Sequence, residues 1–231
     1  MSTPRLLVHV EGQTEESFVN EVLGLHLLAY GYGSVSARII GNARLRRRRG
    51  GIRPWPPVKK DIANHLREDK RCVVTTMVDF YGLPRRGSGA WPGRAEASGS
   101  TEQKASHVEN ALSKSIATEM GPGFDDARFI PFVVIHEFES LLFSDCTAFG
   151  NGIGRPDLAP RFAAIRSEFH TPEDINDSPV TAPSKRIEEI VPGYEKPLLG
   201  TLAVLEIGLK RIRSECPHFA KWISRLESLP R

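Results

Sequence analysis

RLLVHVEGQTE, residues 5–15, contains the transition that decides the fold. Its first six residues, 5–10, are mainly apolar and predict a short buried strand, and residues 11–14 predict the turn that follows. Apolar residues then recur at helical spacing over 14–30, and Glu15 lies in the first turn, where the helix dipole favours an acid. We therefore predict a strand, a turn that begins with an acid, and a helix.

The alternation of strand and helix continues along the chain. CVVTTMV, residues 72–78, is an uncharged, mainly apolar run and predicts a central strand buried on both faces. The alternation predicts an α/β fold: a mainly parallel, four-stranded, Rossmann-like sheet sandwiched by helices. The other predicted elements are strands at 34–40 and 128–135 and helices around 58–66 and 105–120. We expect an α/β core at residues 1–145 and a mostly helical C-terminal extension packed on it at 146–231.

Composition narrows the class of protein. The 231 residues are 40% hydrophobic and 26% charged, as in ordinary globular proteins, and the net charge is +3. Three widely spaced cysteines argue against a disulfide framework and against a CxxC-type zinc site. No run approaches the ~20 apolar residues of a membrane span, and the N-terminus lacks the layout of a signal peptide. We expect a cytoplasmic protein without a membrane partner.

Acidic residues follow three of the predicted strands. Glu11 follows the first strand, Asp79 follows the central strand, and Glu137 and Glu139 follow the last. The carboxyl ends of parallel strands meet at one edge of a sheet, where ligands bind. Converging carboxylates repel one another unless protons or cations intervene, and hard cations such as Mg²⁺ or Mn²⁺ prefer oxygen ligands. The pattern predicts a divalent metal site that would act on a phosphodiester.

Each of these acids also has a purely structural explanation, as a turn residue or a helix-start acid. On a helix Glu137 and Glu139 would point about 200° apart, so we expect only one of them, Glu137, to reach the ion. The neighbouring His136 could donate to a phosphate or act as a general acid. It could equally be a hydrogen-bonded histidine at a strand end.

Basic and aromatic residues supply a second predicted feature. An arginine-rich loop follows the second strand, and we expect it to contact phosphates without reading sequence. Trp55 and Trp91 could stack on unpaired bases or anchor their own loops. The predicted nucleic-acid contacts in this part of the chain are Arg44, Arg46, Arg47, Arg48, Arg49 and Arg53.

VEGQTE, residues 10–15, resembles the first motif of Toprim domains, the fold of type IA topoisomerases, primases and OLD-type nucleases. The resemblance implies that Glu11 lies by the metal and takes part in acid–base chemistry. It implies that Asp79 is the first aspartate of the Asp-x-Asp motif, although Tyr81 replaces the second. Glu15 matches an acid that OLD-type nucleases use four residues beyond the first glutamate. Glu137 or Glu139 would then replace the missing ligand.

Over nearly its full length the chain resembles the DUF4276 family, which is described as Toprim-like. The phrases that carry this resemblance are VDFYGLP at 78–84, HEFE at 136–139 and APSKR at 182–186. OLD-type nucleases also use a downstream lysine, and the resemblance makes Lys185 the candidate for that catalytic role. Arg186 would contact a phosphate, and Tyr194 and Lys196 lie nearby in the sequence. Such proteins pair a Toprim domain with an ABC-type ATPase, so the resemblance implies a separate ATPase partner.

Three functions fit this sequence. The first is a metal-dependent phosphodiesterase, a DNA or RNA nuclease in bacterial defence or repair. The second is a catalytically degenerate Toprim-like module that binds nucleic acid or a partner. The third is a small-molecule phosphatase or nucleotidyl enzyme. The chain has no HExxH, no GxSxG and no glycine-rich phosphate loop after a strand, which argues against other common enzyme classes. It is compatible with a homodimer.

Overall fold

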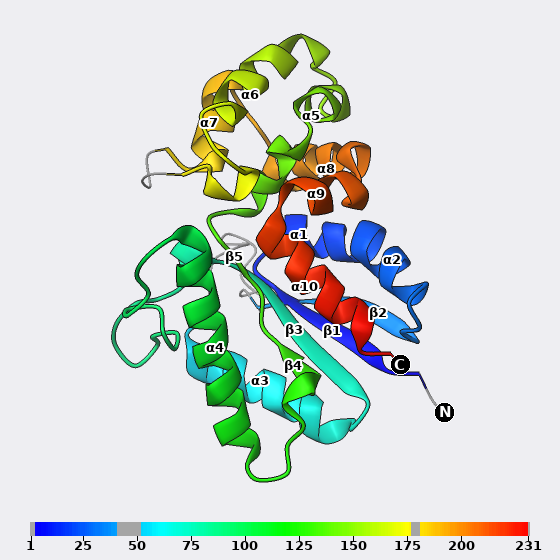
Figure 1. The fold of residues 1–231 in the computed structure, drawn as a ribbon, viewed down its shortest axis with the longest axis vertical. Helices are drawn as coiled ribbons and strands as arrows, with labels where there is room; N and C mark the ends of the chain where they lie inside the picture. Colours follow the sequence, from blue (N-terminus) through cyan, green and yellow to red (C-terminus); the bar gives the residue numbers. More distant parts are fainter. Residues whose placement is uncertain (1–2, 41–51, 177–180, 231) are drawn as a thin grey trace.

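A parallel sheet forms the centre of the computed structural model, which describes residues 3–40, 52–176 and 181–230 (Figure 1). The strand order is β2-β1-β3-β4, β5 pairs with β3, and every pair is parallel. The prediction of an α/β fold with a mainly parallel sheet is therefore confirmed. The strands are β1 (Arg5–Val10), β2 (Ser34–Ile39), β3 (Cys72–Asp79), β4 (Phe129–Ile130) and β5 (Val133–Val134).

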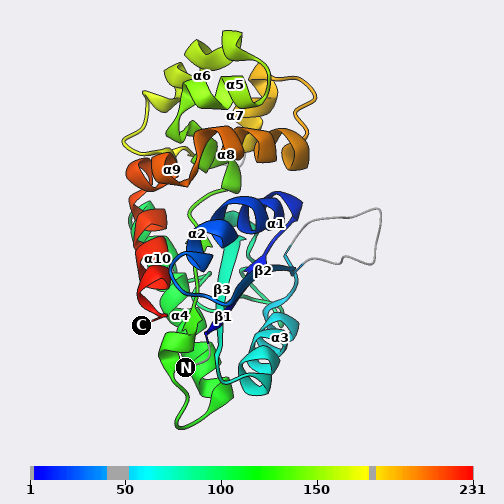
Figure 2. The ribbon, with the colours of Figure 1, turned by 90° about the vertical axis from the view of Figure 1, so that its right-hand side faces the viewer.

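Helices cover both faces of the sheet because side chains on successive strand residues point to opposite faces (Figures 1 and 2). Val8 and Met77 belong to the apolar cluster under one set of helices, whereas Val74 and Val78 belong to the cluster under the other. The first set is α1 (Gln13–Phe18), α2 (Gly24–Leu28) and α10 (Pro217–Ser228). The second set is α3 (Trp55–Glu68) and α4 (Thr101–Met120). A π-helical turn, Val19–Leu23, joins α1 to α2.

The predicted fourth strand at 128–135 is two short strands, so the sheet has five strands and not four. Proline cannot donate to a strand ladder, and Pro131 lies between β4 and β5. Thr76 of β3 bridges the interruption with its side chain. Its hydroxyl accepts from the Phe132 N–H at 3.0 Å and donates to the Phe132 carbonyl at 2.9 Å.

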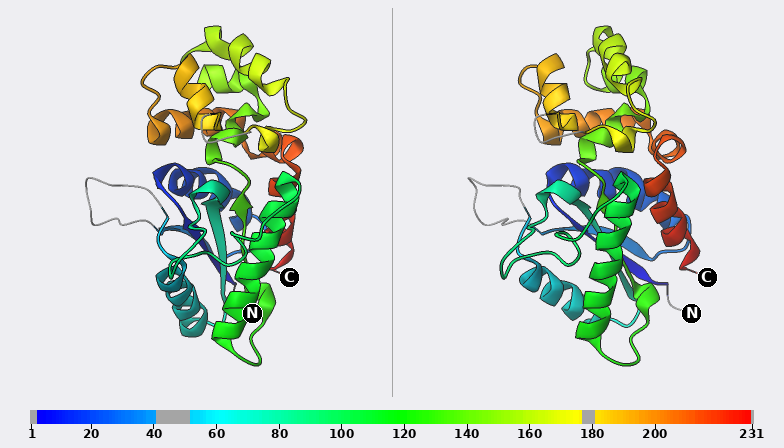
Figure 3. Two further views of the ribbon diagram at one scale, coloured as in Figure 1. Left: turned by 90° about the vertical axis from the view of Figure 1, so that its left-hand side faces the viewer. Right: turned by 60° about the vertical axis from the view of Figure 1, so that its left-hand side comes forward.

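A helical lobe lies beyond the carboxyl ends of the strands (Figures 1 and 3). Phe143, Phe149 and Phe162 are buried together at its centre, and the last two rings stack 4.1 Å apart. The predicted boundary after residue 145 stays a prediction. The helices of the lobe are α5 (Cys146–Gly152), α6 (Ala159–Arg166), α7 (Pro183–Ile190), α8 (Thr201–Ile207) and α9 (Leu209–Glu215).

The last helix, α10, leaves the lobe and returns along the sheet (Figure 1). The indole N–H of Trp222 donates to Thr75 Oγ1 of β3 at 2.9 Å, and the indole stacks on Phe132 with the ring centroids 4.3 Å apart. Within the described part of the chain, no helix is long and apolar enough to cross a membrane.

The two loop tryptophans of the sequence analysis are buried and contact each other. The rings of Trp55 and Trp91 lie 4.9 Å apart, and both are at most 5% exposed. Trp91 donates to the carbonyl of Arg53, and Trp55 donates to the hydroxyl of Ser115. Both indoles therefore anchor their own segments, which leaves neither ring open to a base.

Candidate carboxylate site

Glu11 and Asp79 lie side by side because their strands are parallel neighbours. The registers pair Val10 of β1 with Met77 of β3, so the two acids leave the sheet at the same edge. The backbone N–H of Asp79 donates to Glu11 Oε2 over 3.4 Å. Gly82 approaches the same carboxylate so closely that a Cβ there would lie 3.2 Å from Oε2. The segment from Asp79 to Gly82 thus forms one wall around Glu11.

Glu15 reaches the same place from the first turn of α1. Its Oε2 accepts from the backbone N–H of Gly12 at 3.1 Å, so the carboxylate caps its own helix. The side chain is 7% exposed. The charge of Glu11 raises the pKa of Glu15, and the charge of Glu15 raises the pKa of Asp79, which places all three acids in one electrostatic group.

Glu137 and Glu139 both reach a single cation, Lys196, which corrects the expectation that they diverge. Lys196 Nζ lies 3.2 Å from Glu139 Oε2 and 3.9 Å from Glu137 Oε2. The helical spacing fails because Glu137 is extended, with φ −141° and ψ 155°, and only Glu139 lies in the 3₁₀ segment Phe138–Ser144. Glu137 Oε2 also accepts from the backbone N–H of Ser184 at 2.9 Å.

We call Glu11, Glu15, Asp79, Glu137 and Glu139 the carboxylate site. Burial first, and the neighbouring carboxylates second, raise the pKa values of Glu11 and Glu15 to about 7. The same causes raise the pKa of Asp79 well above its usual value. Burial also raises the pKa of Glu139, although Lys196 opposes that shift. The site is therefore short of positive charge near neutral pH.

Lys196 supplies part of the missing charge. Burial disfavours its ammonium, but Glu139, Glu137 and Asp79 outweigh burial and raise the pKa of Lys196. Tyr194 lies close by with a buried hydroxyl, and burial together with Glu139 raises its pKa. A cation and a phenol from the lobe thus face acids that come mainly from the strand ends.

The carboxylate oxygens of the site are suitable ligands for a hard divalent cation, but they are not gathered around one point. Asp79 Oδ1 and Tyr194 Oη are buried and have no hydrogen-bond partner among the described residues. Carboxylate oxygens are the ligands that Mg²⁺ and Mn²⁺ prefer. Nevertheless, in residues 3–40, 52–176 and 181–230 no three Asp, Glu, His or Cys side chains are arranged to hold an ion together. Shared coordination would require the acids to move closer.

Other predicted site residues lie elsewhere or have other partners. Lys185 is exposed, and its Nζ pairs with Glu188 at 2.7 Å. Arg186 donates to the Thr181 carbonyl at 3.0 Å and lies over the ring of Phe169. Arg53 pairs with Asp61 over 3.7 Å. The remaining predicted phosphate contacts, Arg44, Arg46, Arg47, Arg48 and Arg49, lie outside the described residues.

His136 is buried beneath an aromatic ring at the edge of the carboxylate site. It is 2% exposed, and its imidazole stacks on Tyr81 with the centroids 5.4 Å apart and the planes 14° apart. Sequence reasoning named His136 but missed the roles of Tyr81 and Lys196. Both contacts depend on the packing of distant segments, so no local pattern could have revealed them.

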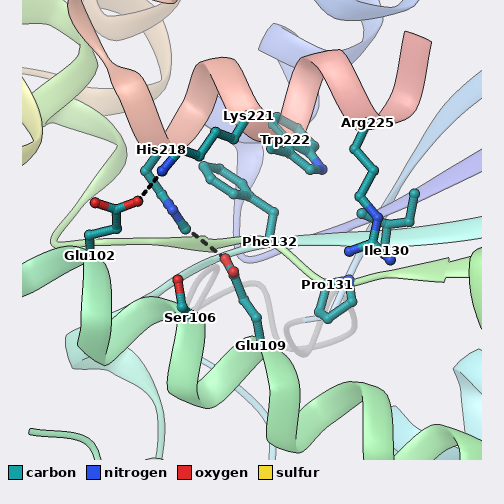
Figure 4. Close-up of a pocket in the computed structure, with 10 residues that line it drawn as sticks. All are labelled: Glu102, Ser106, Glu109, Ile130, Pro131, Phe132, His218, Lys221, Trp222 and Arg225. Carbon is teal, nitrogen blue, oxygen red and sulfur yellow. Dashed lines mark hydrogen bonds and ion pairs between the residues drawn. The ribbon is translucent and has the colours of Figure 1, made fainter. Parts of the chain in front are cut away.

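A separate pocket lies between α4 and α10 (Figure 4). His218 of α10 contacts Glu109 of α4 at 2.8 Å, and Lys221 contacts Glu102. The pocket holds about 180 Å³ and none of its lining residues belongs to the carboxylate site. Small-molecule sites commonly hold about 300 Å³ or more, so this pocket is small for such a ligand.

The comparison with protein families covers almost the whole chain. The family described as "Domain of unknown function (DUF4276)" matches residues 10–227. The chain belongs to the DUF4276 family. The match includes the whole carboxylate site and Lys196 of this DUF4276 protein. Searches of curated proteins and of solved structures find no match to it.

Proposed function

We propose that this DUF4276 protein is a phosphodiesterase that depends on Mg²⁺ or Mn²⁺ and cleaves DNA or RNA, with a Toprim-like arrangement of its acids. The observation that carries the proposal is the convergence of Glu11, Asp79 and Glu137 from three strand ends, in an environment that raises the pKa values of the first two. Buried like charges are stable together only with protons or cations. A divalent ion satisfies this requirement.

Glu11, Asp79 and Glu137 would hold the ion, with Glu15 and Glu139 beside them. A bound ion of this kind polarises a phosphodiester and lowers the pKa of a bound water. The Toprim resemblance gives Glu11 a part in acid–base chemistry beside the ion. Lys196 presents an ammonium beside Glu139 and would stabilise negative charge on the phosphate.

The non-catalytic alternative has an observation of its own. Lys196 already neutralises part of the carboxylate site, and the acids in the described residues are not gathered for an ion. Under this alternative the protein binds nucleic acid, or a separate ABC-type ATPase, without cleaving a phosphodiester. The proposed context of bacterial defence or repair applies to both functions.

A cleavage assay separates the two functions. Purified protein is incubated with plasmid DNA, single-stranded DNA and RNA in Mg²⁺, in Mn²⁺ and in EDTA. We expect cleavage that requires the metal and that falls by about 100-fold or more in Glu11→Gln and Asp79→Asn, since each removes a charged ligand. The matched control is Glu21→Gln, because Glu21 is an exposed glutamate of the π-helical turn that follows α1.

Two results would contradict the proposal. The first is metal-dependent cleavage at the wild-type rate by both site variants. The second is the absence of cleavage under all conditions, together with a melting temperature that neither Mg²⁺ nor Mn²⁺ changes. Isothermal titration with Mn²⁺ measures the ion directly, and we expect Asp79→Asn to weaken its binding while Glu21→Gln leaves it unchanged.

A further inference from the structure

Tyr81 presents an exposed aromatic ring beside the carboxylate site. The residue is 44% exposed, although its ring makes three aromatic or cationic contacts. One face stacks on His136, and its edge meets Phe80 at 87°. The guanidinium of Arg94 lies over the ring, 5.6 Å from its centroid, and is itself fixed by a 2.7 Å hydrogen bond to the Phe80 carbonyl. The ring is therefore held in place within a residue that stays 44% exposed.

The position of this ring is fixed by the carboxylate site on both sides. Asp79, two residues earlier, donates its N–H to Glu11, and Gly82, the next residue, packs against the Glu11 carboxylate. His136, under the ring, immediately precedes Glu137. The stack of Tyr81 on His136 thus joins two of the segments that carry the acids. Anything bound at the acids would have this ring within reach.

Charge next to Tyr81 favours a polyanion. Arg85 and Arg86 follow in the chain, and both are exposed. Neither forms an ion pair with another residue of the described ranges. The other aromatic candidates of this region, Trp55 and Trp91, are buried and contact each other. Tyr81 is the ring that remains available for contact with a ligand.

We propose that Tyr81 is a stacking platform for an unpaired nucleobase, so that the carboxylate site takes single-stranded nucleic acid. This inference rests on the proposed function, because the acids would hold the phosphodiester next to the stacked base. Every base has a π-face, so stacking on an aromatic ring tolerates any sequence. A base inside an intact duplex offers no free face, so the platform selects strands or ends that are unpaired.

Binding of fluorescent oligonucleotides tests the stacking role separately from cleavage. The probes are a single-stranded DNA containing 2-aminopurine, its blunt duplex, and the same strand with abasic residues. All are measured in EDTA and again in Ca²⁺. We expect wild-type protein to bind the single strand at least about fivefold more tightly than the abasic strand or the duplex, with quenching of 2-aminopurine.

Three variants sharpen the test. Tyr81→Phe keeps the ring, and we expect affinity within about twofold of the wild type. Tyr81→Leu removes the ring, and we expect at least about fivefold weaker binding of the single strand with unchanged binding of the abasic strand. Tyr30→Leu is the matched control because Tyr30 is also 45% exposed but follows α2. Circular dichroism confirms that each variant is folded.

The outcomes distinguish this inference from the proposed function. Equal loss of affinity for normal and abasic strands in Tyr81→Leu, or no loss for either, overturns the stacking role. Metal-dependent cleavage can persist in that case, and the proposed function then stands alone. Conversely, Tyr81→Leu can lose affinity only for strands that contain bases, while the wild-type protein cleaves no substrate. That result supports the stacking role and overturns the proposed phosphodiesterase activity.

Discussion

The imidazole of His9 has its charge state set by burial. It is 2% exposed on β1, and its Nε2 is buried without a hydrogen-bond partner among the described residues. Burial, followed by the nearby His65 and Arg38, lowers the pKa of His9 to about 3. The unfolded chain binds this proton near pH 6.5, so between these values the unfolded state carries more protons than the folded state.

Stability is therefore lost as the pH falls below about 6.5. For this one group the loss amounts to about 2 kcal/mol between pH 7 and pH 5. Between pH 7 and pH 5 we expect the free energy of unfolding to fall less in His9→Leu than in the wild type, by up to about 2 kcal/mol. Urea denaturation of both proteins at pH 7 and pH 5 measures the difference. Parallel pH dependence of the two proteins would contradict the assignment.

Lys196 is a counter-ion whose removal should lower stability. Its ammonium faces two carboxylates, one of which, Glu139, is 2% exposed. We expect Lys196→Met to lower the free energy of unfolding by about 1–2 kcal/mol, less than for a fully buried pair because the lysine is 40% exposed. Lys185→Met is the control, with an expected change within about 0.5 kcal/mol, since that pair is exposed on both sides. Thermal or urea denaturation compares them, and equal losses would count against this account.

At the scale of elements, Thr76 joins two strands that the backbone alone leaves separate. Its hydroxyl satisfies both the N–H and the carbonyl of Phe132 between β4 and β5. We expect Thr76→Val to cost about 1–3 kcal/mol, because two buried polar groups lose their partner. Thr76→Ser, which keeps the hydroxyl, should cost clearly less. Urea denaturation ranks the two variants, and a larger loss in the serine variant would refute this role.

The elements that sequence predicted best are those whose pattern repeats over many residues. The uncharged, mainly apolar run at 72–78 predicted β3, and its side chains are buried on both faces. The split was missed although its cause, Pro131, stands in the sequence; only the hydroxyl of Thr76 that bridges it belongs to another strand. The extended backbone of Glu137 was missed because its carboxylate accepts from Ser184, 47 residues away.

At the scale of the molecule, α10 closes one face of the sheet. Its buried residues Phe219, Trp222, Ile223 and Leu226 join the same apolar cluster as β1 and α1. Each such side chain contributes about 1.5–3 kcal/mol when buried, and their sum is comparable to the whole stability of a typical domain. We expect deletion of 217–231 to abolish cooperative unfolding, measured by circular dichroism and urea titration. Deletion of 229–231 is the control and should leave the transition cooperative.

From sequence alone, the acids of the candidate site could be brought together only where they directly follow strands of the sheet. Glu11 and Asp79 could be placed together because parallel strands bring their ends to one edge. Lys196 and Tyr194 come from the lobe, and their approach depends on how that lobe packs on α1. A side chain at Gly200, for example, would meet Thr14 and Tyr194 at 3.1 Å. No spacing along the chain records such a contact.

The return of α10 to the sheet has a consequence for the synthesis of the protein. The first residue of α10, Pro217, follows the last residue of β5, Val134, by 83 positions. At about 5–20 residues per second, a ribosome needs roughly 4–17 s to bridge that distance. Throughout this interval the nascent sheet lacks one of the helices that cover this face, and the apolar side chains under α10 are open to other chains. Such transiently exposed apolar surface is the kind that aggregates before folding is complete.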